Sequence, residues 1–124
     1  MRAGGAWRRD RNRGASARGY GYPASGHPWA MIELHQAEWC PFSSAVRERL
    51  TELDVPFVAR PVPAYHGDRT ELEELAGTQD IPVVVFEDGT VMGGDTQAIL
   101  AALDERFPEP PSAQAHKEQL AAHR

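Results

Sequence analysis

Hydrophobic and polar positions repeat with two different periods from residue 31 onward. Residues 31–35 and 56–60 have the short apolar pattern of strands, whereas residues 41–53 place apolar side chains such as Val46 and Leu50 on one helical stripe. Charged residues fill the opposite side of that stripe, as on a helix with one solvent-facing side. The order and spacing of these segments predict a βαβ unit.

The next segments predict a second helix and a buried strand. The run Asp68-Arg69-Thr70-Glu71 resembles a capping box, which predicts a helix that ends at Gly77. Residues 83–86 form an unbroken run of three valines and a phenylalanine, a composition typical of a strand buried on both faces.

The pattern ends with a hairpin and a last helix. Asp88-Gly89 is a turn dipeptide that leads into a strand over residues 90–92. Asp95 or Thr96 is expected to cap a helix that Pro108 terminates. The predicted order is βαβαββα, an α/β fold with a four-stranded mixed sheet flanked by helices.

The two ends of the chain lack this regular patterning. Residues 1–30 are dense in Gly, Arg and Ser and are predicted to be disordered. They are interpreted either as a basic tail that touches RNA or acidic surfaces, as a targeting segment, or as the product of a misassigned start that belongs at Met31. Residues 31–107 are the predicted domain. Residues 108–124 form a Pro-, Ala- and Gln-rich tail with a weak, solvent-exposed helix.

Composition and charge narrow the classes of function. Residues 1–30 carry six arginines and one aspartate, a net charge of +5, whereas residues 31–124 carry 7 basic and 17 acidic side chains, a net charge of −10. This acidic balance argues against nucleic-acid binding by the domain. No apolar run reaches the ~20 residues of a membrane span. We expect no membrane association and a cytoplasmic location.

The single cysteine is the strongest chemical signal. Cys40 follows the first predicted strand and directly precedes Pro41, which suits the first position of a helix. Unpaired N–H groups and the helix dipole stabilise an anion there, so the position favours a reactive thiolate. Ser43 stands where a two-cysteine redox motif would carry its second thiol. One cysteine and five scattered histidines predict no metal site.

Three motifs in this order resemble the glutaredoxin family and the N-terminal domain of glutathione transferases, both of the thioredoxin-like fold. Cys40-Pro41-Phe42-Ser43 looks like the glutaredoxin Cys-Pro-(Tyr/Phe)-(Cys/Ser) site. Ile81-Pro82 is similar to the element that carries a cis proline. Gly93-Gly94-Asp95-Thr96 is similar to the segment before the last helix in both families. The resemblance covers roughly residues 31–107.

The resemblance implies a monothiol oxidoreductase that reduces glutathione mixed disulfides. Cys40 would be the nucleophile, and the hydroxyl of Ser43 would donate a hydrogen bond to its thiolate. Phe42 and Trp39 would form an apolar lip beside the thiol, and Pro41 and Phe42 are expected among the residues that contact glutathione.

The same resemblance implies a set of glutathione contacts. The backbone of Ile81, before a cis Pro82, would pair with the cysteinyl unit of glutathione like an added strand. The γ-glutamyl end would meet Gly94, Asp95 and Thr96 at the start of the last helix. The glycyl carboxylate would meet Arg69, with Arg60 as the alternative cation.

Cofactor and partner predictions follow from this interpretation. Glutathione or another low-molecular-weight thiol is the expected co-substrate, with no tightly bound cofactor, and the expected partners of a monomer are glutathionylated or disulfide-containing proteins. Three alternatives remain open at this stage. These are a transferase-type glutathione-binding domain, an iron–sulfur carrier that bridges two subunits, and a binding domain with an inert thiol.

Overall fold

Four strands form one mixed sheet in the computed structural model, which describes residues 31–124. The strands lie in the order β2-β1-β3-β4, with β1 parallel to β2 and antiparallel to β3, and β3 antiparallel to β4. Their bounds are Ile32–Gln36 for β1, Phe57–Pro61 for β2, Val83–Val85 for β3 and Val91–Gly93 for β4. The predicted disorder of residues 1–30 lies outside the described residues.

The helices connect these strands in the predicted order. They are α3 (Pro41–Glu52), the short 3₁₀ helix η2 (His66–Asp68), α4 (Thr70–Ala76), α5 (Thr96–Arg106) and α6 (Ala113–His123). The α/β fold and the βαβαββα order are therefore confirmed, and the arrangement is that of the thioredoxin-like fold. Helix α6 lies in the tail where the sequence predicts a weak helix, and most of its residues are exposed.

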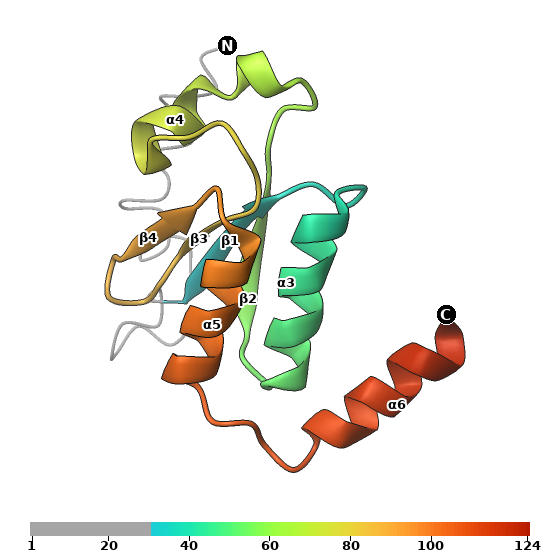
Figure 1. The fold of residues 1–124 in the computed structure, drawn as a ribbon. Helices are drawn as coiled ribbons and strands as arrows, with labels where there is room; N and C mark the ends of the chain where they lie inside the picture. The colour runs from blue at the N-terminus through green and yellow to red at the C-terminus, as the bar shows by residue number, and fades with distance from the viewer. Residues whose placement is uncertain (1–30) are drawn as a thin grey trace, which may run out of the picture. The chain divides into compact units, whose positions relative to one another are not determined.

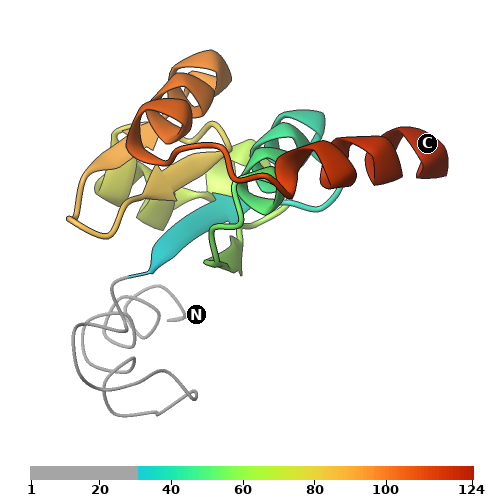
Figure 2. The ribbon, with the colours of Figure 1, turned by 90° about the horizontal axis from the view of Figure 1, so that it is seen from below.

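The core lies between one face of the sheet and two helices. Helices α3 and α5 lie side by side against this face (Figures 1 and 2). Leu34 of β1 and Val84 of β3 meet Leu50 of α3 and Leu103 of α5, and all four are fully buried. Each such side chain contributes about 1.5–3 kcal/mol when it leaves water. This packing fixes the positions of the strand ends and helix starts that carry the candidate site.

The predicted capping box at the start of α4 is wrong. Asp68 is the last residue of η2, and its N–H donates to the carbonyl of Tyr65 at 3.0 Å, so it lies one residue before the cap position. The residue at the N-cap is Arg69, which forms no side-chain cap. Its side chain turns into the protein instead, with consequences for the site described below.

The C-terminal helix is attached to α3 by polar contacts as well as by packing. Ala113 is buried at the start of α6, and Arg124 forms an ion pair with Glu48 of α3. Within the described part of the chain, no helix is long and apolar enough to cross a membrane.

Candidate functional site

The thiol of Cys40 lies at the N-terminus of α3, as the sequence predicts. Cys40 is the N-cap residue, and its sulfur accepts a hydrogen bond from the N–H of Ser43 at 3.4 Å. Pro41 occupies the first helical position, where no N–H is required. Only 6% of Cys40 is exposed. The backbone thus presents donors to the sulfur, while little of the residue contacts solvent.

The surroundings of the thiol favour its charged form. Burial by itself raises the pKa of Cys40, but hydrogen bonding by Ser43, the N–H of Phe42 and the charge of Arg69 outweigh it, and the pKa lies below its ordinary value. The Ser43 hydroxyl is fully buried and close enough to contribute to this shift, yet no hydrogen bond of ordinary geometry forms to it within residues 31–124. A buried hydroxyl without an acceptor is able to rotate toward a thiolate.

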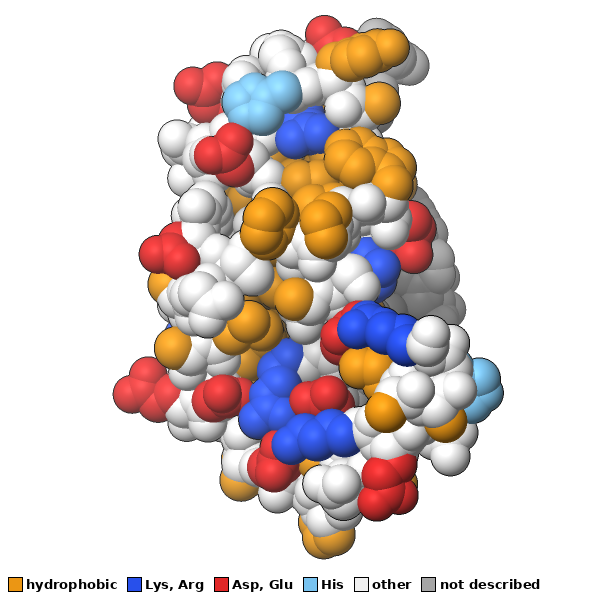
Figure 3. Space-filling view, turned by 45° about the vertical axis from the view of Figure 1, so that its right-hand side comes forward, with side chains coloured by type: hydrophobic (Ala, Val, Ile, Leu, Met, Phe, Trp, Pro, Cys, Tyr) orange, Lys and Arg blue, Asp and Glu red, His pale blue; other side chains and the backbone are white. Residues whose placement is uncertain are grey.

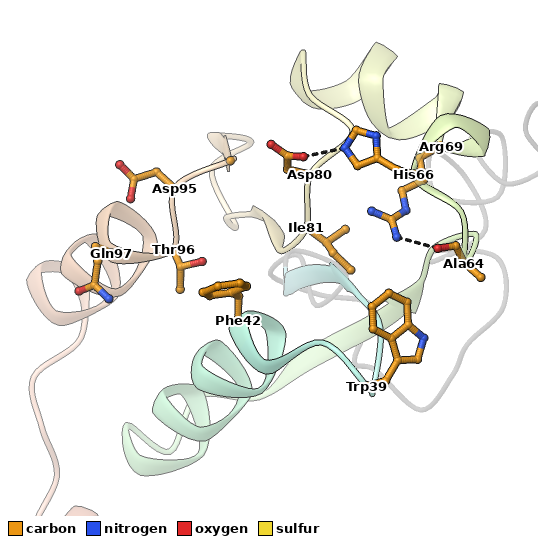
Figure 4. Close-up of a pocket in the computed structure, with 11 residues that line it drawn as sticks. Trp39, Phe42, Ala64, His66, Arg69, Asp80, Ile81, Asp95, Thr96 and Gln97 are labelled. Carbon is orange, nitrogen blue, oxygen red and sulfur yellow. Dashed lines mark hydrogen bonds and ion pairs between the residues drawn. The ribbon is translucent and has the colours of Figure 1, made fainter.

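A pocket of about 680 Å³ opens next to the thiol. Figure 4 shows Ile81 at its centre, with Phe42 and Trp39 below, Arg69 and His66 on one flank, and Asp95 and Thr96 on the other. Its lining residues are Trp39, Phe42, Ala64, His66, Arg69, Asp80, Ile81, Gly94, Asp95, Thr96 and Gln97. Seven of these lining residues were predicted from the sequence: Trp39, Phe42, Arg69, Ile81, Gly94, Asp95 and Thr96. The other predicted site residues, Cys40, Pro41, Ser43 and Pro82, do not line the pocket.

Arg69 brings a buried positive charge to one flank of the pocket. It is 5% exposed. Its guanidinium donates to the carbonyls of Pro63 at 2.9 Å, Ala64 at 3.1 Å and Gln79 at 3.0 Å. Within residues 31–124 it forms no ion pair with a carboxylate. Three carbonyl dipoles thus orient the guanidinium, and its charge remains available to an anion in the pocket.

The opposite flank is the start of α5. The carboxylate of Asp95 accepts a hydrogen bond from the N–H of Ala98 at 3.1 Å and caps the helix, so the predicted cap is confirmed. Gly94 adopts a φ of 84°, which favours glycine. The exposed Asp95 and the first N–H groups of an 11-residue helix therefore meet at this end of the pocket.

The centre of the pocket is formed by the segment before β3. The Ile81–Pro82 peptide bond is cis, as predicted from the resemblance. Pro82 is buried, whereas Ile81 is partly exposed toward the pocket. Within the described residues, the backbone groups of Ile81 form no hydrogen bond. They are therefore able to pair with an extended ligand.

Four pocket residues were not predicted from the sequence: Ala64, His66, Asp80 and Gln97. A hydrogen bond of 2.7 Å between the His66 ring and the Asp80 carboxylate joins η2 to the segment before β3 (Figure 4). Asp80 and Gln97 are sequence neighbours of predicted residues, and that adjacency could have identified them. Arg60, the alternative cation, lies outside the pocket lining and pairs with Glu33 at 3.4 Å.

This architecture matches a known family. Residues 34–111 match the model of the glutathione S-transferase N-terminal domain. The chain belongs to this family. No curated protein matches it.

Solved structures of glutathione transferases share the fold of this transferase-type domain. A diazinon-metabolizing enzyme from the silkworm Bombyx mori is 24% identical over 63% of this chain and 38% of its own, with a TM-score of 0.56. A domain-containing protein from Marinobacter aquaeolei is 26% identical over 63% and 40%, with a TM-score of 0.54. A homologue from Sulfitobacter, solved with bound glutathione, is 21% identical over 69% and 44%, with a TM-score of 0.56. The chain spans about two fifths of the length of these relatives.

The described part of this transferase-type domain has no group of side chains suited to bind a metal ion. Within residues 31–124, no three His, Cys, Asp or Glu side chains are grouped so that they could hold a metal ion.

Proposed function

We propose that the chain is a glutathione-dependent thiol–disulfide oxidoreductase that removes glutathione from mixed disulfides through Cys40. The observation that carries the proposal is the thiol at the N-cap of α3, whose pKa is lowered despite burial and which adjoins a pocket with a buried cation. A thiolate is the attacking form in disulfide exchange, so these features match the chemistry.

The charges of the pocket fit a peptide thiol with charged ends. Arg69 on one flank suits the glycyl carboxylate of glutathione, and its lack of an ion pair within residues 31–124 leaves its charge for that role. Asp95 on the other flank suits the γ-glutamyl ammonium, while the start of α5 suits the neighbouring carboxylate. Ile81, between the flanks, suits the backbone of the cysteinyl unit. The bound glutathione in the Sulfitobacter homologue is in keeping with this ligand.

The proposed reaction consists of two exchanges. The Cys40 thiolate attacks the glutathione sulfur of the mixed disulfide, which forms a Cys40–glutathione disulfide and releases the substrate thiolate to take up a proton. The thiolate of a second glutathione then attacks the same glutathione sulfur. This step releases oxidised glutathione and restores the Cys40 thiolate. Ser43 donates to the sulfur while it carries charge. No second cysteine is required, which accords with a chain that has one.

The test compares the full chain with Cys40→Ser on a glutathionylated peptide, with glutathione as reductant. We expect turnover by the chain and none by the variant. After treatment with oxidised glutathione, intact mass should show one glutathione adduct on the chain and none on Cys40→Ser. An adduct without turnover would contradict the proposed oxidoreductase activity and would show only that glutathione modifies the Cys40 thiol. The absence of an adduct would remove the proposed Cys40 chemistry altogether.

A second candidate is a transferase-type domain that binds glutathione without exchanging disulfides. The near-complete burial of Cys40, at 6% exposure, favours it, since exchange requires access to the sulfur. The transferase relatives are also more than twice as long as the stretch they share with this chain. Calorimetry with reduced glutathione distinguishes the two candidates. Binding of equal strength by the chain and by Cys40→Ser, without any adduct, would favour this second candidate.

A further inference from the structure

Three large aromatic side chains are exposed, two of them in the pocket lining and the third between two lining residues in the sequence. Within residues 31–124, the exposed large hydrophobic residues are Trp39 at 65%, Phe42 at 60% and Tyr65 at 77%. Phe42, in the first turn of α3, and Trp39, in the turn before that helix, line the pocket. Tyr65 is the residue before η2. Single exposed apolar residues are ordinary, but a gathering of aromatic residues at one site marks an interaction surface.

Tyr65 extends this surface beyond the pocket itself. Its sequence neighbours Ala64 and His66 line the pocket, but Tyr65 does not. A ligand of the size of glutathione in this pocket is therefore not expected to contact the Tyr65 ring. Figure 3 shows hydrophobic side chains gathered over this end of the domain, while most lysine and arginine side chains in the view lie toward the other end. The ring of Tyr65 thus suits a larger partner that continues past the pocket.

The charges near the mouth indicate the chemistry of that partner. Asp95 lines the pocket and is exposed, and Asp68 is exposed three residues after Tyr65. Neither carboxylate forms an ion pair within the described residues, whereas the nearby cation, Arg69, is buried. Residues 31–124 also carry a net charge of −10. Because Asp95 is assigned to the γ-glutamyl ammonium of glutathione, Asp68 and the net negative charge remain to attract a partner with basic side chains, and the aromatic residues suit its apolar side chains.

We propose that Trp39, Phe42 and Tyr65 form an aromatic rim that docks the polypeptide part of a glutathionylated protein, and that this rim selects segments with basic and apolar residues next to the modified cysteine. This inference rests on the proposed function, because glutathione in the pocket positions the attached polypeptide at the rim. Trp39 and Phe42 would contact the residues beside the modified cysteine. Tyr65 and Asp68 would contact residues further along the segment.

The test measures binding to the full chain carrying Cys40→Ser, so that no exchange occurs. The probes are two glutathionylated peptides of equal length, one with Arg and Leu around the cysteine and one with Glu and Ser, and oxidised glutathione as the small ligand. We expect the Arg/Leu peptide to bind about tenfold more tightly than the Glu/Ser peptide, and this preference should weaken at high salt. Adding Tyr65→Ser should weaken the Arg/Leu peptide about fivefold and leave oxidised glutathione unchanged. Tyr65→Phe should restore most of the loss.

Three results would overturn the aromatic rim as a docking site. They are equal affinity for the two peptides, an equal loss for oxidised glutathione in Tyr65→Ser, and self-association that Tyr65→Ser abolishes, since the rim would then bind a second copy. Failure of the proposed function has a different signature. Oxidised glutathione would not bind, or the full chain with Cys40 would not turn over, whatever the preference between the peptides.

Discussion

Two arginines, Arg49 in the last turn of α3 and Arg69 at the N-cap of α4, differ in how the protein surrounds their positive charge. Arg49, in the last turn of the helix, forms ion pairs with Glu52 at 2.8 Å, Asp104 at 2.7 Å and Glu109 at 2.9 Å. Arg69 is more deeply buried and donates to three backbone carbonyls instead of carboxylates.

The different surroundings suggest different roles for the two charges: Arg49 stabilises the fold, whereas the charge of Arg69 is available to a ligand. The three carboxylates around Arg49 compensate its charge and tie α3 to α5 and to the segment before α6. The carbonyls around Arg69 orient the guanidinium without supplying negative charge. Burying a cation without an anion is costly. A pocket that contains such a cation beside a thiol of lowered pKa is therefore expected to bind an anion.

The largest expected effect is on ligand binding in Arg69→Met. Removal of a buried, charge-assisted contact costs about 1.5–3 kcal/mol, so affinity for oxidised glutathione should fall roughly 10- to 100-fold. Calorimetry measures the affinity, and thermal unfolding of the same variant shows whether it remains folded. Arg49→Met is the matched control, with the same substitution at the other arginine, and should bind as tightly as the unchanged chain. Equal losses of affinity in the two variants would contradict the distinction.

The second prediction concerns the stability of the fold, which we expect to depend on the ion pairs of Arg49. Arg49→Met leaves Glu52 and Asp104 without this cation and Glu109 with Lys117 alone, and the Arg49 side chain is 20% exposed. We expect the free energy of unfolding to fall by about 1–2 kcal/mol, measured by urea denaturation. Lys117→Met, which removes an exposed partner of Glu109, should cost clearly less stability than Arg49→Met. Added salt should reduce the loss of unfolding free energy in both variants. The loss in Arg49→Met should still be the larger one.

The comparison also shows which features local sequence is able to predict. The order of strands and helices follows from short-range periodicity, and the cap at Asp95 follows from residues three apart in the chain. Both predictions are confirmed. The Arg49 contacts join residues 55 and 60 positions apart, to Asp104 and Glu109. No local pattern indicates such pairs, because the packing of α3 against α5 brings them together.

The error at the start of α4 has the same origin. Asp68 to Glu71 satisfies the local rule for a capping box, but the rule assigns no tertiary contacts to the residue between Asp68 and Thr70. That residue, Arg69, finds three carbonyls in two separate segments, and the chain enters the helix one position later than predicted. The sequence thus indicated a cation for the pocket, but its burial and its orientation depend on the folded protein.

The smallest expected effect concerns Ser43, the buried hydroxyl below the pocket. The Ser43 hydroxyl is able to rotate toward the Cys40 thiolate and is one of the groups that lower the thiol pKa against the effect of burial, so Ser43→Ala should raise that pKa. At any pH below the pKa, the variant then carries less thiolate and reacts more slowly with iodoacetamide. A bond worth about 1 kcal/mol corresponds to about a fivefold slower rate.

The pH dependence of the iodoacetamide rate measures this shift. The profile of Ser43→Ala should move to higher pH and reach the same plateau, where both thiols are fully ionised. Ser44→Ala, one residue along α3, is the matched control and should leave the profile unchanged. A lower plateau without a shift would mean that Ser43 governs access to the sulfur and not its charge.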